Sequence, residues 1–255
     1  NRKPATQKMY DGRDYYANAA AYQYNSKIGG NSASILSNTS KGYSFNFTVG
    51  VSMAQKKGFS GSLFFSHTTA QGTTDNLGSN ASSAWGATPI ISNPNDIFLA
   101  SSIDALPSRI VGTLSYRKEY LKHLATTVTL YYNGSSSGRY SYTYGGDVNG
   151  DAINADLLYI PKDASEVNFV AANGFTVQQQ VDAFNALIKS SKYLSSHKGQ
   201  IAGRNAGVMP WNSRFDLKFI QDVFMHVGKT KNTLQFTATI INFANFFIKK
   251  TEIEK

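Results

Sequence analysis

The chain lacks cysteine, and it is poor in charged side chains and in long apolar runs. Its 255 residues include no Cys, which excludes disulfides and thiolate metal sites. Charged residues make up 16% of the chain, well below the roughly 25% of soluble domains. No segment approaches the roughly 18 apolar residues of a membrane-spanning helix. Aromatic residues reach 13%, and this combination is typical of transmembrane β-barrels.

Two further absences concern chemistry and partners. The chain contains no H-E-x-x-H or Walker sequence, and its four histidines are scattered singly. We therefore predict that the protein is not an enzyme and has no catalytic or cofactor-binding residues. The net charge of +9 raises nucleic-acid binding as a function. The basic clusters are short, however, and no basic helix accompanies them, so we expect no nucleic-acid partner.

Residues 43–53 alternate between large apolar and small or polar side chains. Successive side chains of a strand point to opposite faces, so this segment has one apolar and one polar face. The apolar row is Tyr43, Phe45, Phe47, Val49, Val51 and Met53, and the polar row is Ser44, Asn46, Thr48, Gly50 and Ser52. The apolar row suits either a protein core or a lipid bilayer, and alternation alone does not distinguish them.

The same alternation predicts six strands, which begin near residues 36, 59, 108, 124, 211 and 234. Phe64 is an exception, because it falls in the polar row of the second strand. Short connections at 54–58, 120–123 and 225–232 alternate with long polar ones at 70–107 and 145–210. Outer-membrane barrels have this rhythm of brief periplasmic turns and long outer loops.

Charged residues line one face of the fifth strand: Arg214, Asp216, Lys218 and Asp222. Inside a packed sandwich they would be costly to bury, whereas a watery lumen or a solvent-facing sheet accommodates them. We favour a barrel over a β-sandwich, and predict an all-β fold with an antiparallel transmembrane β-barrel, long extracellular loops and one loop helix. Thr176 and Gln179 form a predicted capping box for that helix. We expect it to pack the loop onto the barrel rim rather than to act as a ligand lid.

The densest set of potential ligands lies in the second long connection. Asp147, Asn149, Asp151, Asn154 and Asp156 place side-chain oxygens at intervals that suit a hard cation such as calcium. The first three match an EF-hand loop, but Asp156 comes two residues early and Ala152 replaces the usual glycine. The alternative is a polar turn without metal. Nearby, Tyr140, Tyr142 and Tyr144 suit either sugar stacking or an aromatic girdle, and we favour the girdle.

Several segments resemble a known family in their order. They are Asn38 to Phe45, Arg109 to Glu119, Tyr140 to Asp151, Asn154 to Pro161, Lys192 to Ser195, Arg204 to Lys218 and Leu234 to Phe243. Together they look like the C-terminal barrel portion of the Oar-like TonB-dependent receptors of Bacteroidota, relatives of the SusC-like importers. The DVNGD segment alone also resembles dockerin loops.

The resemblance implies a 22-stranded, plugged barrel in the Gram-negative outer membrane, energised through TonB. We expect residues 1–35 to be a loop and the end of a preceding strand, 36–247 to be barrel strands and their loops, and 248–255 to be a charged tail. No plug or TonB-contact segment is visible, so we expect a partial chain.

The implied function is import of a nutrient, or handling of a surface lipoprotein or secreted protein. Two alternatives stay open. One is a calcium-binding cell-surface adhesin or scaffold-docking module without transport. The other is a soluble β-sandwich binder.

Overall fold

The computed structural model describes residues 5–18, 37–96 and 98–246. These residues divide into two compact units, each assembled from several stretches of the chain. The sheet unit comprises residues 45–69, 106–137 and 209–255, and the loop unit comprises 1–44, 70–105 and 138–208. Each unit is described by itself.

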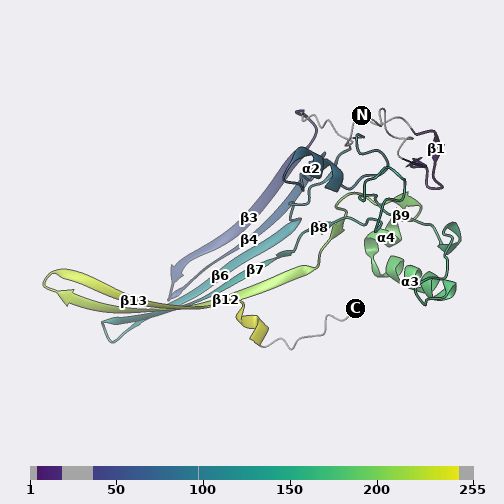
Figure 1. Ribbon diagram of the computed structural model, residues 1–255. Helices are drawn as coiled ribbons and strands as arrows, with labels where there is room; N and C mark the ends of the chain where they lie inside the picture. The colour runs from purple at the N-terminus through teal and green to yellow at the C-terminus, as the bar shows by residue number, and fades with distance from the viewer. Residues whose placement is uncertain (1–4, 19–36, 97, 247–255) are drawn as a thin grey trace. The chain divides into compact units, whose positions relative to one another are not determined.

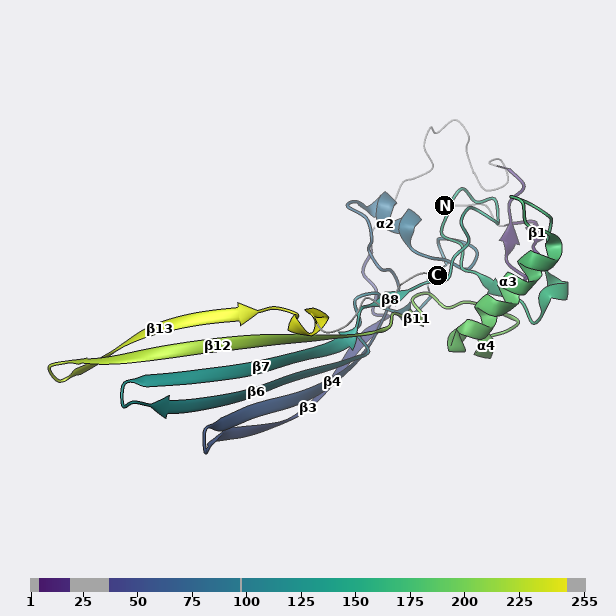
Figure 2. The ribbon, with the colours of Figure 1, turned by 90° about the horizontal axis from the view of Figure 1, so that it is seen from below.

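Six long antiparallel strands form the sheet unit (Figures 1 and 2). They are β3 (Tyr43–Lys56), β4 (Phe59–Gly72), β6 (Ser108–Tyr120), β7 (Leu124–Ser136), β12 (Trp211–Val227) and β13 (Thr230–Ile240). Their order is β13-β12-β7-β6-β4-β3, and the short β5 (Ala100–Ser101) pairs with the end of β4. All six predicted strands are therefore confirmed, and the fold is a largely β, antiparallel one.

The hairpin turns are tighter than the sequence predicted. Lys57 and Gly58 both have positive φ angles, 50° and 87°, which suits a two-residue hairpin turn. The predicted connection at 225–232 was too long, because β12 continues to Val227 and β13 begins at Thr230. Strand pairing continues up to the residues where the backbone reverses. Polar residues close to a hairpin turn can therefore still belong to the strands.

The sheet of the described chain is open. β13 and β3 lie at its two edges and do not pair with each other in the described ladder. A closed barrel is thus not formed by residues 5–18, 37–96 and 98–246 themselves.

The loop unit contains the helices. They are α2 (Ala81–Ala87), α3 (Val177–Ser190), α4 (Lys192–Ser196) and the 3-10 turn η1 (Ala164–Glu166), while η2 (Phe243–Phe246) follows β13 in the sheet unit. Three pairs of two-residue strands join its segments: β1 (Gln7–Lys8) with β2 (Asp14–Tyr15), β9 (Tyr159–Ile160) with β10 (Gln200–Ile201), and β8 (Arg139–Tyr140) with β11 (Gly207–Val208). Among the described residues, no helix has the length and apolar character to cross a membrane.

The predicted helix and its cap are confirmed in α3. Thr176 accepts a hydrogen bond from the backbone of Gln179, whose side chain accepts one from the backbone of Thr176. The helix packs on a core inside the loop unit, formed by Ile160, Ile188, Leu194 and Ala202. Val177 and Leu187 of the helix remain exposed. The sequence missed α2 and α4, which are short.

Candidate functional site

One face of the sheet is apolar from strand to strand. Leu114 pairs with Leu130, and Leu130 pairs with Leu217. Directly paired residues point to the same side of a sheet, so the apolar rows continue one another. This apolar face comprises Phe59, Leu63 and Phe65 of β4, Ile110, Leu114 and Tyr116 of β6, Val128, Leu130 and Tyr132 of β7, Phe215, Leu217, Phe219 and Val223 of β12, and Leu234, Phe236, Ala238 and Ile240 of β13.

The apolar face has no covering layer within the described chain. Leu114 is 51% exposed and Phe236 is 59% exposed. Among the described residues of the sheet unit, Ala125 is the one buried hydrophobic side chain. A β-sandwich would bury such a face against a second sheet, and the other sheets among the described residues consist of two-residue strands.

The opposite face is polar and internally hydrogen-bonded. Short side chains pair across neighbouring strands through four contacts: Asn46 with Thr68 at 2.6 Å, Thr48 with Ser66 at 3.0 Å, Ser62 with Thr113 at 2.8 Å and Ser115 with Thr129 at 2.8 Å. These contacts place the polar row of β3 on this face. By alternation, Tyr43, Phe45, Phe47 and Val49 then lie on the apolar side.

Charged residues link strands that are not neighbours on this polar face. Arg117 of β6 reaches across β7 and donates to Asp222 of β12 at 2.6 Å. Gln235 of β13 donates to the other carboxylate oxygen of Asp222 at 2.8 Å. The predicted charged row of β12 is confirmed on one face, since its members pair with Asn133, Tyr131, Thr129 and Ala125.

Phe64 is accommodated on the polar face by a glycine. A Cβ at position 50 would overlap the ring of Phe64, so the ring occupies the space that a side chain on Gly50 would fill. Sheets use such aromatic–glycine neighbours to support a residue without a side chain. The position of Phe64 in the polar row is therefore explained by its contact with Gly50.

Hydrogen-bonding groups mark both ends of the apolar face. Toward the loops, the indole N–H of Trp211 donates to Tyr132 at 3.3 Å, and Tyr132 is bonded to Ser213 at 3.1 Å. Toward the short turns, Thr126 donates to Gln221 at 2.6 Å and shares a 2.8 Å hydrogen bond with Tyr120. Aromatic rings with one polar end suit a boundary between apolar and aqueous surroundings.

The Asp/Asn loop is closed by its own backbone. Asp147 accepts hydrogen bonds from the N–H groups of Gly150 and Ala152, at 2.7 and 2.6 Å. Asn149 accepts one from Asp151 at 3.0 Å, and Asp151 accepts one from Ile153 at 2.8 Å. These are Asx-type turns, which form with or without a metal.

The five predicted ligands differ in their burial. Asn149, Asp151 and Asp156 are buried and Asp147 is half-buried, whereas Asn154 is exposed. In the described part of the chain, no group of three or more acidic or histidine side chains is placed to hold a metal. Calcium at this loop therefore stays a prediction.

Arg13 is the cation that sequence reasoning missed. Its buried guanidinium contacts Asp11 at 2.7 Å, Asp156 at 3.7 Å and the carbonyl of Leu157 at 2.8 Å. More than 130 positions separate Arg13 from Asp156, so no local pattern links them. Burial raises the pKa of the Asp156 carboxyl, while the N–H of Val148 and the charge of Arg13 act against the rise. The loop is thus stabilised by a side chain from the N-terminal segment.

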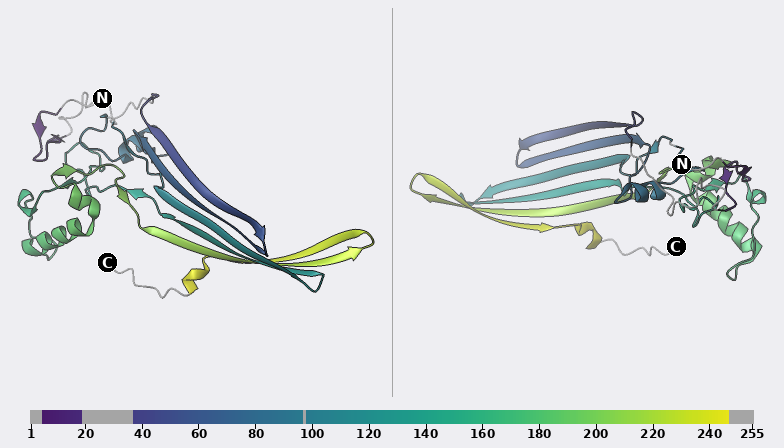
Figure 3. Two further views of the ribbon diagram at one scale, coloured as in Figure 1. Left: turned by 180° about the vertical axis from the view of Figure 1, so that it is seen from behind. Right: turned by 45° about the horizontal axis from the view of Figure 1, so that its top comes forward.

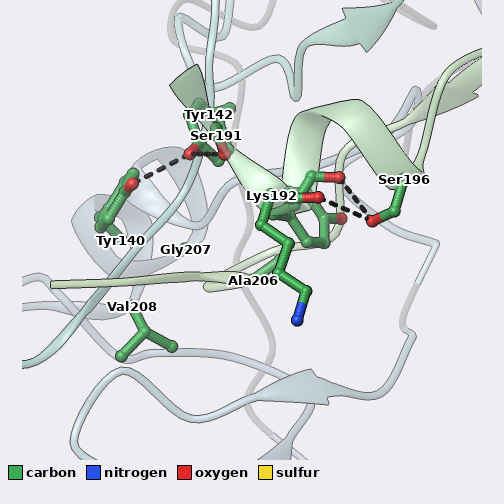
Figure 4. A pocket seen from close by; sticks show the side chains of 9 residues that line it. Tyr140, Tyr142, Ser191, Lys192, Ser196, Ala206, Gly207 and Val208 are labelled. Atoms are coloured by element: carbon green, nitrogen blue, oxygen red, sulfur yellow. Dashed lines mark hydrogen bonds between the residues drawn. The ribbon is translucent and has the colours of Figure 1, made fainter. Parts of the chain in front are cut away.

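Two of the three predicted girdle tyrosines line a cavity of about 420 Å³ in the loop unit (Figure 4). The hydroxyls of Tyr140, Tyr142 and Ser191 form a chain with spacings of 2.9 and 3.0 Å. The hydrogen bond with Tyr142 is the main cause that raises the pKa of Tyr140 to about 12, and burial is the second. Tyr142 also packs on the core of the loop unit, so these rings have a structural role there.

Comparisons of the chain with protein-family models, with curated proteins and with solved structures give no match. What the protein does must be inferred from its own residues and geometry.

Proposed function

We propose that this chain is part of a TonB-dependent outer-membrane receptor and supplies a stretch of its β-barrel. The observation that carries the proposal is the two-faced sheet. An uncovered apolar face opposite a hydrogen-bonded polar face is the arrangement that a membrane barrel wall requires, with lipid outside and a polar lumen inside.

Strand length supports the same conclusion. The strands β6, β7 and β12 have 13, 13 and 17 residues. A tilted transmembrane strand needs roughly 9–11 residues, so each is long enough to cross the hydrocarbon layer. The two unpaired edges, β3 and β13, would pair with further strands of the full-length protein, because exposed edges are not tolerated in lipid.

The stagger of the hairpins also supports a barrel. β6 continues four residues beyond Tyr116, the partner of the first residue of β4, and β12 continues four beyond Val223. An offset of about 13 Å over two strand spacings of about 4.8 Å corresponds to a tilt of roughly 54°, steeper than the usual barrel range. Strands inclined to a barrel axis show such a progressive offset, with tilts of about 35–45°.

In this function, the polar face with Arg117 and Asp222 lines the lumen and the long connections reach the outside. A plug elsewhere in the full-length protein couples import to TonB, and the cargo is a nutrient or a surface or secreted protein partner. These assignments rest on the family resemblance of the sequence.

The test is fractionation of the full-length protein in its native membrane. We expect it in the outer membrane, resistant to alkaline carbonate and released by detergent. A protein that remains dispersed without detergent would favour the surface-adhesin alternative. A full-length sequence consisting of a signal peptide and this region alone, without a plug, would contradict the receptor.

A further inference from the structure

The three hairpin turns of the sheet unit lie at the same end of the sheet (Figure 3). Because β4 pairs antiparallel with β6 and β7 pairs antiparallel with β12, the turns β3–β4, β6–β7 and β12–β13 all fall at one end, and the long connections fall at the other. This end carries six exposed lysines, two from each hairpin: Lys56, Lys57, Lys118, Lys122, Lys229 and Lys231. We call these residues the lysine rim.

Few carboxylates oppose the lysine rim. Glu119 is the exposed carboxylate among the described residues of these hairpin ends, and it contacts Arg117 at 3.4 Å. Asp222 is buried and also pairs with Arg117. The two acids therefore share one arginine, and the lysines are left with a net positive field. Lys231 lies 3.8 Å from the ring centre of Phe224 and remains exposed.

On β6 and β7 the lysine rim follows the apolar face in a definite order. The leucine row formed by Leu114, Leu130 and Leu217 comes first along the strands. The hydrogen-bonded group of Thr126 and Gln221 follows, with the rings of Phe59 and Tyr116, whose centres lie 4.6 Å apart at an interplanar angle of 42°. Lys118 pairs with Thr126 at the outer edge of this group, and Lys122 follows it in the turn. Apolar, then amphipathic, then cationic groups match the hydrocarbon, interface and phosphate layers of one bilayer leaflet.

We propose that the lysine rim binds the anionic phosphates of glycerophospholipids in the leaflet at the short-turn side. This inference rests on the proposed function, in which short turns face the periplasm. Lysines near an anionic membrane surface each add favourable electrostatic energy, and their stems cover the adjoining apolar surface. The rim would thus select anionic lipids and fix the depth of the barrel in the bilayer.

The experiment uses full-length protein in nonionic detergent, titrated with phosphatidylglycerol while the melting temperature is followed. Phosphatidylcholine serves as the zwitterionic reference. We expect phosphatidylglycerol to raise the melting temperature. The triple variant Lys57→Gln, Lys122→Gln, Lys229→Gln should bind it about 100-fold more weakly, since each lysine near an anionic surface contributes roughly fivefold. All three substitutions lie in turns, and the melting temperature without lipid reports whether folding is intact.

A matched control changes three exposed lysines of the loop unit, Lys41→Gln, Lys189→Gln and Lys198→Gln, and should leave the lipid affinity unchanged. Equal losses in both triple variants, or no loss in either, would overturn the proposal. So would a larger rim-dependent shift with lipopolysaccharide than with phosphatidylglycerol. If the protein needs detergent but shows no preference for phosphatidylglycerol, the lipid-binding role of the lysine rim is wrong and the proposed function stands. If the protein needs no detergent, the proposed function itself is wrong.

Discussion

The ring of Phe64 lies over Gly50 on the polar face of the sheet. Any side chain at position 50 must displace that ring, because the glycine and the phenylalanine occupy neighbouring strands on the same face. We expect Gly50→Leu to destabilise the sheet unit by about 1–3 kcal/mol, the usual cost of overpacking. Thermal unfolding in detergent measures the change.

Two further variants define the cause of that loss. Gly50→Leu combined with Phe64→Ala should recover much of the stability, because the ring that clashes is removed. Gly145→Ala is the control, since a Cβ there meets nothing within 4 Å. An effect of Gly145→Ala as large as that of Gly50→Leu would contradict this interpretation.

The environment of the apolar face can be tested with a charge. Leu114 is exposed and lies in the middle leucine row, so Leu114→Arg should destabilise a membrane-embedded sheet by about 2–4 kcal/mol. Thr237→Arg, on the exposed polar side of β13, should change stability by less than about 1 kcal/mol. Unfolding from lipid vesicles in denaturant distinguishes the two, and equal effects would argue against a bilayer at the apolar face.

Arg13 anchors the N-terminal segment to the Asp/Asn loop. Arg13→Met removes the cation beside the buried Asp156 and should cost about 3–5 kcal/mol, because a buried charge is left without its partner. Lys8→Gln removes an exposed lysine that pairs with Asp14 on the same segment, and should cost at most about 1 kcal/mol. Protease resistance of the loop unit and thermal unfolding report both changes.

Asp156 predicts a dependence of stability on pH. Its pKa is raised in the folded chain, so the folded state holds the proton more tightly than the unfolded chain does. The resulting stabilisation is fully present below the unfolded pKa of about 4 and is lost as the pH rises through the folded value. The melting temperature of the parent, relative to Asp156→Asn, should therefore fall as the pH rises above about 4. A parent melting temperature that rises with pH relative to Asp156→Asn would mean that the pKa of Asp156 is lowered in the folded chain. The control is Asp96→Asn, at an exposed position.

Calcium binding at the Asp/Asn loop remains testable as a separate prediction. The alternating oxygens of Asp147, Asn149 and Asp151 lead us to expect that millimolar calcium raises the melting temperature. Asp151→Asn should abolish the rise, whereas Asn154→Ala, at an exposed position, should reduce it less. An identical melting temperature with and without calcium would mean that the loop is closed by its backbone and Arg13 alone.

The sequence by itself determined the strands, their two faces and the capped helix α3. Alternation along 43–53 or 211–224 is a local property, since the direction of each side chain depends only on its place in the strand. The capping box is local for the same reason, because Thr176 and Gln179 are three residues apart. The ends of the strands were less certain, as at Val227 and Thr230, where polar residues continue the ladder.

Only the tertiary structure decided which residues meet across the chain. Register set Leu114 beside Leu130, placed Gly50 beneath Phe64 and gathered three separate lysine pairs at one end of the sheet. Packing brought Arg13 to Asp156, so that a residue predicted as a metal ligand also takes part in a buried ion pair. Such contacts depend on register and on the pairing of separate segments, and a one-residue change of register would move every side chain of a strand to the other face.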